Sequence, residues 1–164
     1  MPDGASCKIA IPGVVTVEED SGCSWCVTSP AVAVDWSTQI VNVEEAHQIT
    51  RGKGATIAIL DTGIAVHPEF ADANIDVAPS QIPQESPLDL HGHGTATTGI
   101  VCAQGIRLLG ISPDAKVVSI KVLNRHGVGK WAWVAAGIEK AVEMKADVVL
   151  MALGGPQKSM MVED

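Results

Sequence analysis

The chain alternates between apolar runs of strand length and segments with helical or turn character. Residues 55–60, 115–123 and 147–153 are mostly apolar and rich in Ala, Val, Ile and Leu. Runs of this length predict strands that are buried on both faces of a sheet. Residues 75–77 predict one further, short strand.

Helical patterns fill the intervals between these runs. A segment of small and apolar residues from about Gly94 to residue 103 predicts a helix that ends before Gly105. Residues 131–145 predict an amphipathic helix whose apolar positions are Val134, Ile138, Ala141 and Val142. Strands separated by helices of this length imply parallel crossovers, so we expect an α/β fold with a three-layer, mostly parallel sheet.

The pattern is weaker before residue 55. Turn-forming residues interrupt short apolar pieces there. Residues 14–17 predict a strand, and residues 41–48 predict a helical turn.

Composition narrows the class of protein. The 164 residues are 46% hydrophobic and 18% charged, which excludes a disordered chain. The net charge is −8 and no cluster of Lys or Arg interrupts it, so we expect no nucleic-acid partner. No apolar run approaches the roughly 18 residues that span a bilayer, and we expect no membrane partner. The first twenty residues lack the apolar centre of a signal peptide, so the sequence assigns no compartment.

Four cysteines allow two kinds of interpretation. Cys23 and Cys26 have the spacing of redox motifs and of half a zinc site, but no second pair completes a set of four ligands. A disulfide or free thiols remain alternatives for Cys7, Cys23 and Cys26. Cys102 lies in the apolar helical segment and is interpreted as a small core residue.

Two side chains are candidates for catalysis. Asp61 directly follows the first strong strand, and His93 lies at the start of a helix between Gly92 and Gly94. Side chains from successive loops converge at the carboxyl ends of parallel strands. A carboxylate in this position is often only a turn residue. A histidine held at a helix start and paired with a carboxylate, however, is suited to proton transfer.

The motifs around these residues occur in a recognisable order. Residues 58–64 read Ala-Ile-Leu-Asp-Thr-Gly-Ile, and His93-Gly94-Thr95 places the histidine 32 positions after the aspartate. Residues 117–156 follow, and they include Gly-Val-Gly at 127–129 and Leu-Gly-Gly-Pro at 153–156. In this order the three blocks resemble the subtilisin-like serine proteases, the subtilase or peptidase S8 family.

The resemblance implies a subtilisin-like fold and a serine-type endopeptidase that acts on extended polypeptides. It also implies secretion, because members of the family are commonly secreted. It implies that His93 is the general base and that Asp61 orients it, in the chain order Asp, His, Ser. It also implies that two segments bind the substrate as an added strand, through Gly127, Val128, Gly129, Leu153, Gly154 and Gly155. Trp131 is interpreted either as a residue of a substrate pocket or as a packing residue of its helix.

The sequence departs from the family at several positions, including Ala96 and Ala152, and two further departures bear on metal binding and catalysis. Residues 103–110 are about two residues shorter than the calcium-binding loop of many relatives, so the calcium that the family often binds is not assigned to any residue here. The oxyanion asparagine and the Gly-Thr-Ser nucleophile motif do not occur up to residue 164, and Ser159 lacks their context. We therefore expect that the sheet is incomplete at its C-terminal side and that this chain alone is inactive. A missing C-terminal part of the catalytic domain is then a candidate partner.

The N-terminal segment resembles a different part of the family's precursor. Residues 11–20 resemble the last strand of an inhibitory propeptide, and the segment from residue 34 resembles the start of the mature domain. We expect residues 1–33 to be a propeptide remnant and linker. Residues 34–164 are expected to be the N-terminal part of a catalytic domain.

Two other functions fit parts of the sequence. Asp61-Thr62-Gly63 is also the core triplet of aspartic proteases, but those proteins are β-rich and use paired carboxylates. A noncatalytic subtilisin-like protein that binds peptides or acts as a scaffold is the second alternative.

Overall fold

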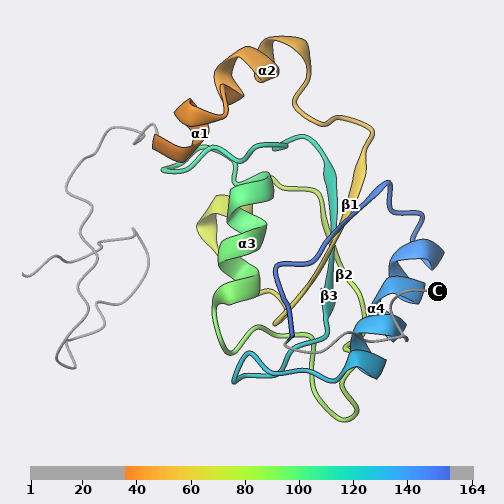
Figure 1. The fold of residues 1–164 in the computed structure, drawn as a ribbon. Coiled ribbons are helices and arrows are strands. Elements are labelled where there is room, and N and C mark those ends of the chain that lie inside the picture. The colour runs from red at the N-terminus through yellow and green to blue at the C-terminus, as the bar shows by residue number, and fades with distance from the viewer. Residues whose placement is uncertain (1–35, 156–164) are drawn as a thin grey trace, which may run out of the picture.

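Four parallel strands form the centre of the structure, in the order β2-β3-β1-β4 (Figure 1). The computed structural model describes residues 36–155. Its strands are β1 (Thr56–Asp61), β2 (Ile75–Val77), β3 (Lys116–Lys121) and β4 (Val148–Leu150). Its helices are α1 (Trp36–Ile40), α2 (Val43–Ile49), η1 (Pro68–Phe70), α3 (His93–Cys102) and α4 (Trp131–Glu143). The predicted strand at residues 14–17, the propeptide segment, Cys7, Cys23, Cys26 and Ser159 lie outside the described residues.

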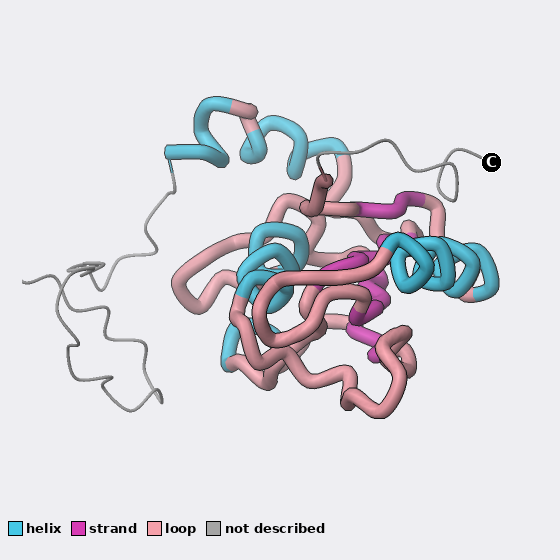
Figure 2. The backbone as a smooth tube through the Cα atoms, turned by 60° about the horizontal axis from the view of Figure 1, so that its bottom comes forward, coloured by secondary structure: helices cyan, strands magenta, loops and turns pink. Residues whose placement is uncertain are grey.

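The sheet lies between helices on its two sides, as Figure 2 shows. Side chains alternate along β1 and β3, so each strand supplies apolar residues to both faces. One face packs with α4 through Ala58, Leu60, Val118, Ile120, Val134 and Ala141. The other face packs with α3 through Ile59, Val117, Val101 and Cys102. This arrangement confirms the predicted three-layer, mostly parallel α/β fold. The alternative prediction of an aspartic protease, which would be rich in β-strands, is wrong for this chain.

Cys102 is part of this core, as predicted. Its side chain is almost completely buried. Burial raises the pKa of the Cys102 thiol to about 11 because the low-dielectric interior disfavours the thiolate. The thiol therefore stays neutral near pH 7, which fits a packing role.

Two packing predictions are wrong in detail. Val142 is 70% exposed, because it lies about 100° around the helix from the buried Ala141 and so falls outside the apolar stripe. The run at 147–153 forms only the three-residue strand β4, and Val148 is 52% exposed. β4 is an edge strand in the described part of the chain and pairs only with β1, so its apolar side chains are not covered on every side.

The short helices α1 and α2 lie at one end of the sheet (Figure 1). α2 confirms the helical turn that residues 41–48 predict, whereas α1 was not predicted. The ring of His47 donates a hydrogen bond from Nε2 to the carbonyl of Ile111, 2.9 Å away, and so connects α2 to the loop before β3. Between residues 36 and 155, no helix has the length and hydropathy needed to cross a bilayer.

Candidate active site

The candidate residues come together at the carboxyl ends of the strands. Asp61 is the last residue of β1, and His93 is the first residue of α3. The segment 127–131 follows β3, and the segment 152–155 follows β4. Because all four strands are parallel, these ends meet at one edge of the sheet.

Asp61 and His93 form a hydrogen-bonded pair. Nδ1 of His93 lies 2.9 Å from both carboxylate oxygens of Asp61. The aspartate side chain is 2% exposed, whereas the histidine side chain is 46% exposed. An ionised carboxylate accepts hydrogen bonds only, so the proton of the neutral ring lies on Nδ1. The lone pair of Nε2 is then available to another molecule, as a general base requires.

Two further donors fix the carboxylate of Asp61. The backbone N–H of Thr62 donates to Oδ1 over 2.6 Å. The hydroxyl of Thr97 lies 3.2 Å from Oδ2 and 3.0 Å from the carbonyl oxygen of His93, so its one proton is shared between these two acceptors. Each carboxylate oxygen therefore has one donor in addition to His93. This arrangement restricts rotation of the carboxylate and holds it under the imidazole.

The helix start that carries His93 is held by a second carboxylate, that of Asp89. Asp89 accepts hydrogen bonds from both the backbone N–H and the hydroxyl of Thr95, and from the N–H groups of His91 and Gly92. Burial raises the pKa of Asp89, but the hydrogen bonds from Thr95, Gly92 and His91 together lower it more, and the resulting pKa is about 2. Asp89 is therefore ionised at neutral pH and stabilises the N-terminus of α3.

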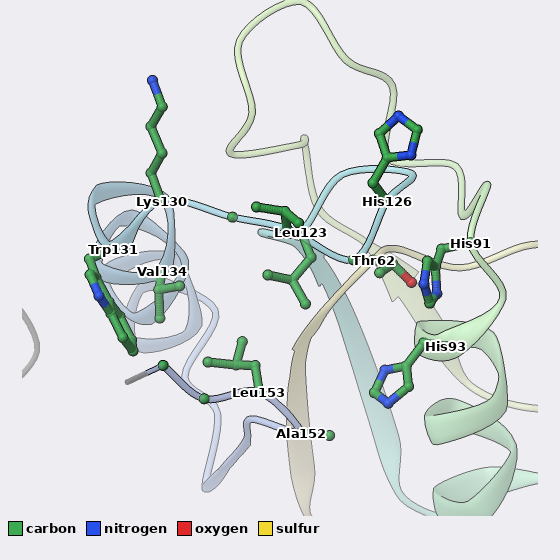
Figure 3. A pocket seen from close by; sticks show the side chains of 15 residues that line it. Thr62, His91, His93, Leu123, His126, Lys130, Trp131, Val134, Ala152 and Leu153 are labelled. Carbon is green, nitrogen blue, oxygen red and sulfur yellow. The ribbon is translucent and has the colours of Figure 1, made fainter. Parts of the chain in front are cut away.

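A pocket of about 490 Å³ opens beside His93. Figure 3 shows Trp131 and Val134 at one end of the pocket and His93 at the other, with Leu123 and Leu153 between them. Both predicted substrate-binding segments line it, with Gly127, Val128, Gly129, Trp131, Leu153, Gly154 and Gly155. The structure brings His93 and the predicted substrate-binding residues to this pocket, and Asp61 lies behind His93 and contacts its ring. Their roles in binding and catalysis stay predictions.

Trp131 combines the two roles that the sequence left open. Its side chain lines the pocket and also packs against the core cluster between α4 and the sheet. A Cβ added at Gly155 would lie 2.6 Å from the indole ring, so the ring lies directly against the backbone of the segment after β4. Because Gly155 has no side chain, the segment after β4 can pack directly against the ring of Trp131 at the start of α4.

Sequence reasoning missed several residues of this site. His91 and His126 line the pocket, and the ring of His91 lies edge-on to that of His93 with 6.2 Å between the ring centroids. The side chain of Asn124 accepts hydrogen bonds from the N–H groups of His126 and Val128 and shapes the turn after β3. Asn is a common turn residue, so this last contact had a sequence signal. His91 and His126 have no sequence signal of their own beyond their proximity to the motifs.

The loop at 103–110 does not fit a calcium ion. The carboxylate of Glu69 accepts hydrogen bonds there from the backbone N–H groups of Ile106, Arg107 and Leu108. Calcium takes six to eight oxygen ligands, several of them carboxylates. Across residues 36–155, no group of three or more His, Cys, Asp or Glu side chains could hold a metal ion. The loop closes around a protein carboxylate that its own N–H groups already bind.

Comparisons with known proteins agree with this geometry. The model of the Subtilase family (Peptidase S8) matches residues 52–163. The Thermostable alkaline protease of Halalkalibacterium halodurans is 36% identical over 156 residues, which cover 93% of this chain and 41% of that protein. The Intracellular serine protease of Paenibacillus polymyxa is 37% identical over 66% of this chain and 35% of its own length. Subtilisin Savinase of Lederbergia lenta is 36% identical over 81% of this chain and 50% of its own length. The chain thus spans half or less of each of these relatives.

Proposed function

The chain belongs to the subtilase family, and we propose that it supplies the Asp and the His of a serine-type endopeptidase that cleaves extended polypeptides. The proposal is carried by the pair of Asp61 and His93 at the edge of a pocket. One ring nitrogen of His93 is held by a buried carboxylate, while the partly exposed ring can reach a substrate.

The geometry supports a defined role for each residue. His93 accepts the proton of a serine hydroxyl through Nε2 and later returns it to the leaving amine. Asp61 keeps the proton on Nδ1 and stabilises the imidazolium that forms during the transfer. The segments 127–129 and 153–155 lie on the same pocket, where their backbone groups can bind a peptide as an added strand.

We propose that the nucleophilic serine belongs to a further segment of polypeptide that completes the sheet. None of the described residues that line the pocket is a serine or a cysteine. β4 has one side without a partner among residues 36–155, and its first residue, Val148, is half exposed. An added strand would cover this edge. In this proposal residues 34–164 are the N-terminal part of a catalytic domain, residues 1–33 are a propeptide remnant and linker, and the isolated chain is inactive.

The test compares two forms of the protein. The longest product that the gene encodes should hydrolyse a chromogenic peptide, and a serine-directed covalent inhibitor should stop the reaction. The 164-residue chain alone should hydrolyse nothing. In the long form, His93→Ala should lower kcat by about a million-fold, a loss established for subtilisin itself rather than obtained from this structure.

Two results would contradict the proposal. Hydrolysis by the 164-residue chain that the serine-directed inhibitor blocks would place the nucleophile within it. Peptide binding without hydrolysis by the long form would instead indicate the noncatalytic binding protein.

A further inference from the structure

A hydrogen bond connects the neighbours of the two catalytic candidates. Thr62 follows Asp61 in the chain, and Gly94 follows His93. The hydroxyl Oγ1 of Thr62 accepts a hydrogen bond from the backbone N–H of Gly94 over 2.9 Å. The same hydroxyl donates to Oδ1 of Asp89 over 2.9 Å. The end of β1 is thus joined to the start of α3 one residue away from the catalytic pair.

Thr62 also replaces a cap that α3 lacks. The N-cap residue of α3 is Gly92, which has φ 96° and no side chain to accept from the first N–H groups. Helices usually obtain this acceptor from the N-cap residue itself. Here the N–H of Gly94 uses the hydroxyl of Thr62, and the N–H of Thr95 uses the carboxylate of Asp89. The orientation of the helix start therefore depends on the residue that follows β1.

Close packing leaves no substitute for this contact. Thr62 borders the pocket but has no exposed surface, so no water contacts its hydroxyl in this packing. A Cβ added at Gly94 would lie 2.3 Å from the carbonyl oxygen of Gly63, so the two backbones approach closely at this point. The hydroxyl must donate to Asp89 and accept from Gly94 at the same time, and Ser and Thr are the residues of this size that can do both.

We propose that Thr62 is a positioning residue, whose hydroxyl fixes the imidazole of His93 over the carboxylate of Asp61. The catalytic part of this inference rests on the proposed endopeptidase function, whereas the structural part does not. A displacement of about 1 Å in a reacting group can lower the rate about a hundredfold. Loss of the hydroxyl is therefore expected to act on kcat, because the imidazole becomes less well oriented, and to leave substrate binding nearly unchanged.

The experiment uses two variants of Thr62 and one matched control in the longest product of the gene. Thr62→Val keeps the shape and removes the hydroxyl, and Thr62→Ser restores the hydroxyl. Thr98→Val removes an equally buried hydroxyl from α3, which donates only to the carbonyl of Gly94 and not to the catalytic pair. Two quantities are measured: kcat and KM for a chromogenic peptide, and the downfield NMR resonance of the Nδ1 proton of His93.

Thr62→Val should lower kcat by about ten- to a hundredfold with KM within about twofold, and should broaden or remove the Nδ1 resonance. Thr62→Ser should recover most of kcat and of the Nδ1 resonance, and Thr98→Val should change neither of these two quantities. The proposal is overturned if Thr62→Val keeps the resonance, or if Thr98→Val lowers kcat as much. If the parent protein hydrolyses nothing, the proposed function fails, and the resonance in the two valine variants still decides whether Thr62 positions His93.

Discussion

The buried ammonium group of Lys121 donates a hydrogen bond to the backbone carbonyl of Thr62, 2.8 Å away. Lys121 is the register partner of Asp61 across β1 and β3, so it lies beside the end of β1 that carries Asp61. The same Nζ lies 3.3 Å from the carbonyl of Leu88 and 3.8 Å from the carboxylate of Glu85. Through these contacts Lys121 connects the turn after β1 to the segment that precedes α3.

Lys121→Met is expected to lower the free energy of unfolding by about 1–3 kcal/mol, because the buried carbonyl of Thr62 loses its donor. Urea unfolding of parent and variant measures the difference. Lys116→Met is the matched control, since the ion pair of Lys116 with Asp76 is about 40–47% exposed and should contribute about 0.5 kcal/mol or less. Equal losses in the two variants would contradict a specific role for the buried lysine.

Asp89 is expected to make stability depend on acid pH. Its pKa is about 2 in the folded protein and 3.8 ordinarily, so the folded state favours the ionised form. The stabilisation is complete above about pH 3.8 and is lost as the pH falls through about 2. Its size is about 2 kcal/mol. Asp89→Asn should therefore be less stable than the parent at pH 6, and the difference should shrink towards pH 2.

Unfolding curves between pH 2 and pH 6 measure this difference. The control is Asp114→Asn, because Asp114 is about two-fifths exposed in its ion pair with Arg51. That variant should differ from the parent by about 0.5 kcal/mol or less at every pH. If the difference in unfolding free energy between the parent and Asp89→Asn stays constant with pH, the prediction is wrong.

The carboxylate of Glu69 is expected to hold the loop at 103–110 without a metal ion. Glu69 is 7% exposed, and Glu69→Gln should lower the unfolding free energy by about 1–3 kcal/mol because backbone N–H groups lose a charged acceptor. Thermal unfolding in excess calcium and in excess chelator should give the same difference between parent and variant. If the difference appears only in calcium, the loop binds a metal ion and the prediction fails.

Much of the fold follows from sequence because its core elements have strong local signals. The apolar runs at 55–60 and 115–123 predict both ends of β1 and of β3 to within two residues. The run at 147–153 predicts a strand longer and more buried than β4, because a run of apolar residues does not say how many strands lie beside it. The periodicity of α4 identifies its core side correctly at Val134 but not at Val142, which lies at the margin of the stripe.

The sequence likewise predicts some residues of the candidate site and not others. Motifs that are local in sequence identify Asp61 and His93. They do not identify all the residues that hold this pair, because some of these contacts join distant positions: Thr62 is 27 residues from Asp89 and 59 residues from Lys121. Such contacts depend on strand register and on the path of loops, which a single sequence does not specify.

Trp131 is expected to contribute more to substrate binding than to catalysis. Its ring lines the pocket with Leu123 and Val134, so an apolar side chain of a peptide would be buried against it. Burial of a large apolar group contributes about 1.5–3 kcal/mol. Trp131→Ala should therefore raise KM about ten- to a hundredfold for peptides with a large apolar residue in this pocket, with a smaller change in kcat.

Steady-state kinetics on two peptides that differ only in a Phe or an Ala at that position measures the effect of Trp131. The matched control is Trp133→Ala, because Trp133 belongs to the same helix but does not line the pocket. The Nζ atom of Lys130 lies 5.2 Å from the centroid of the Trp133 ring. Trp131→Ala should reduce the preference for the Phe peptide, whereas Trp133→Ala should leave it unchanged. If both variants lose the preference equally, the change reflects loosening of α4 rather than a direct contact between the ring and the substrate.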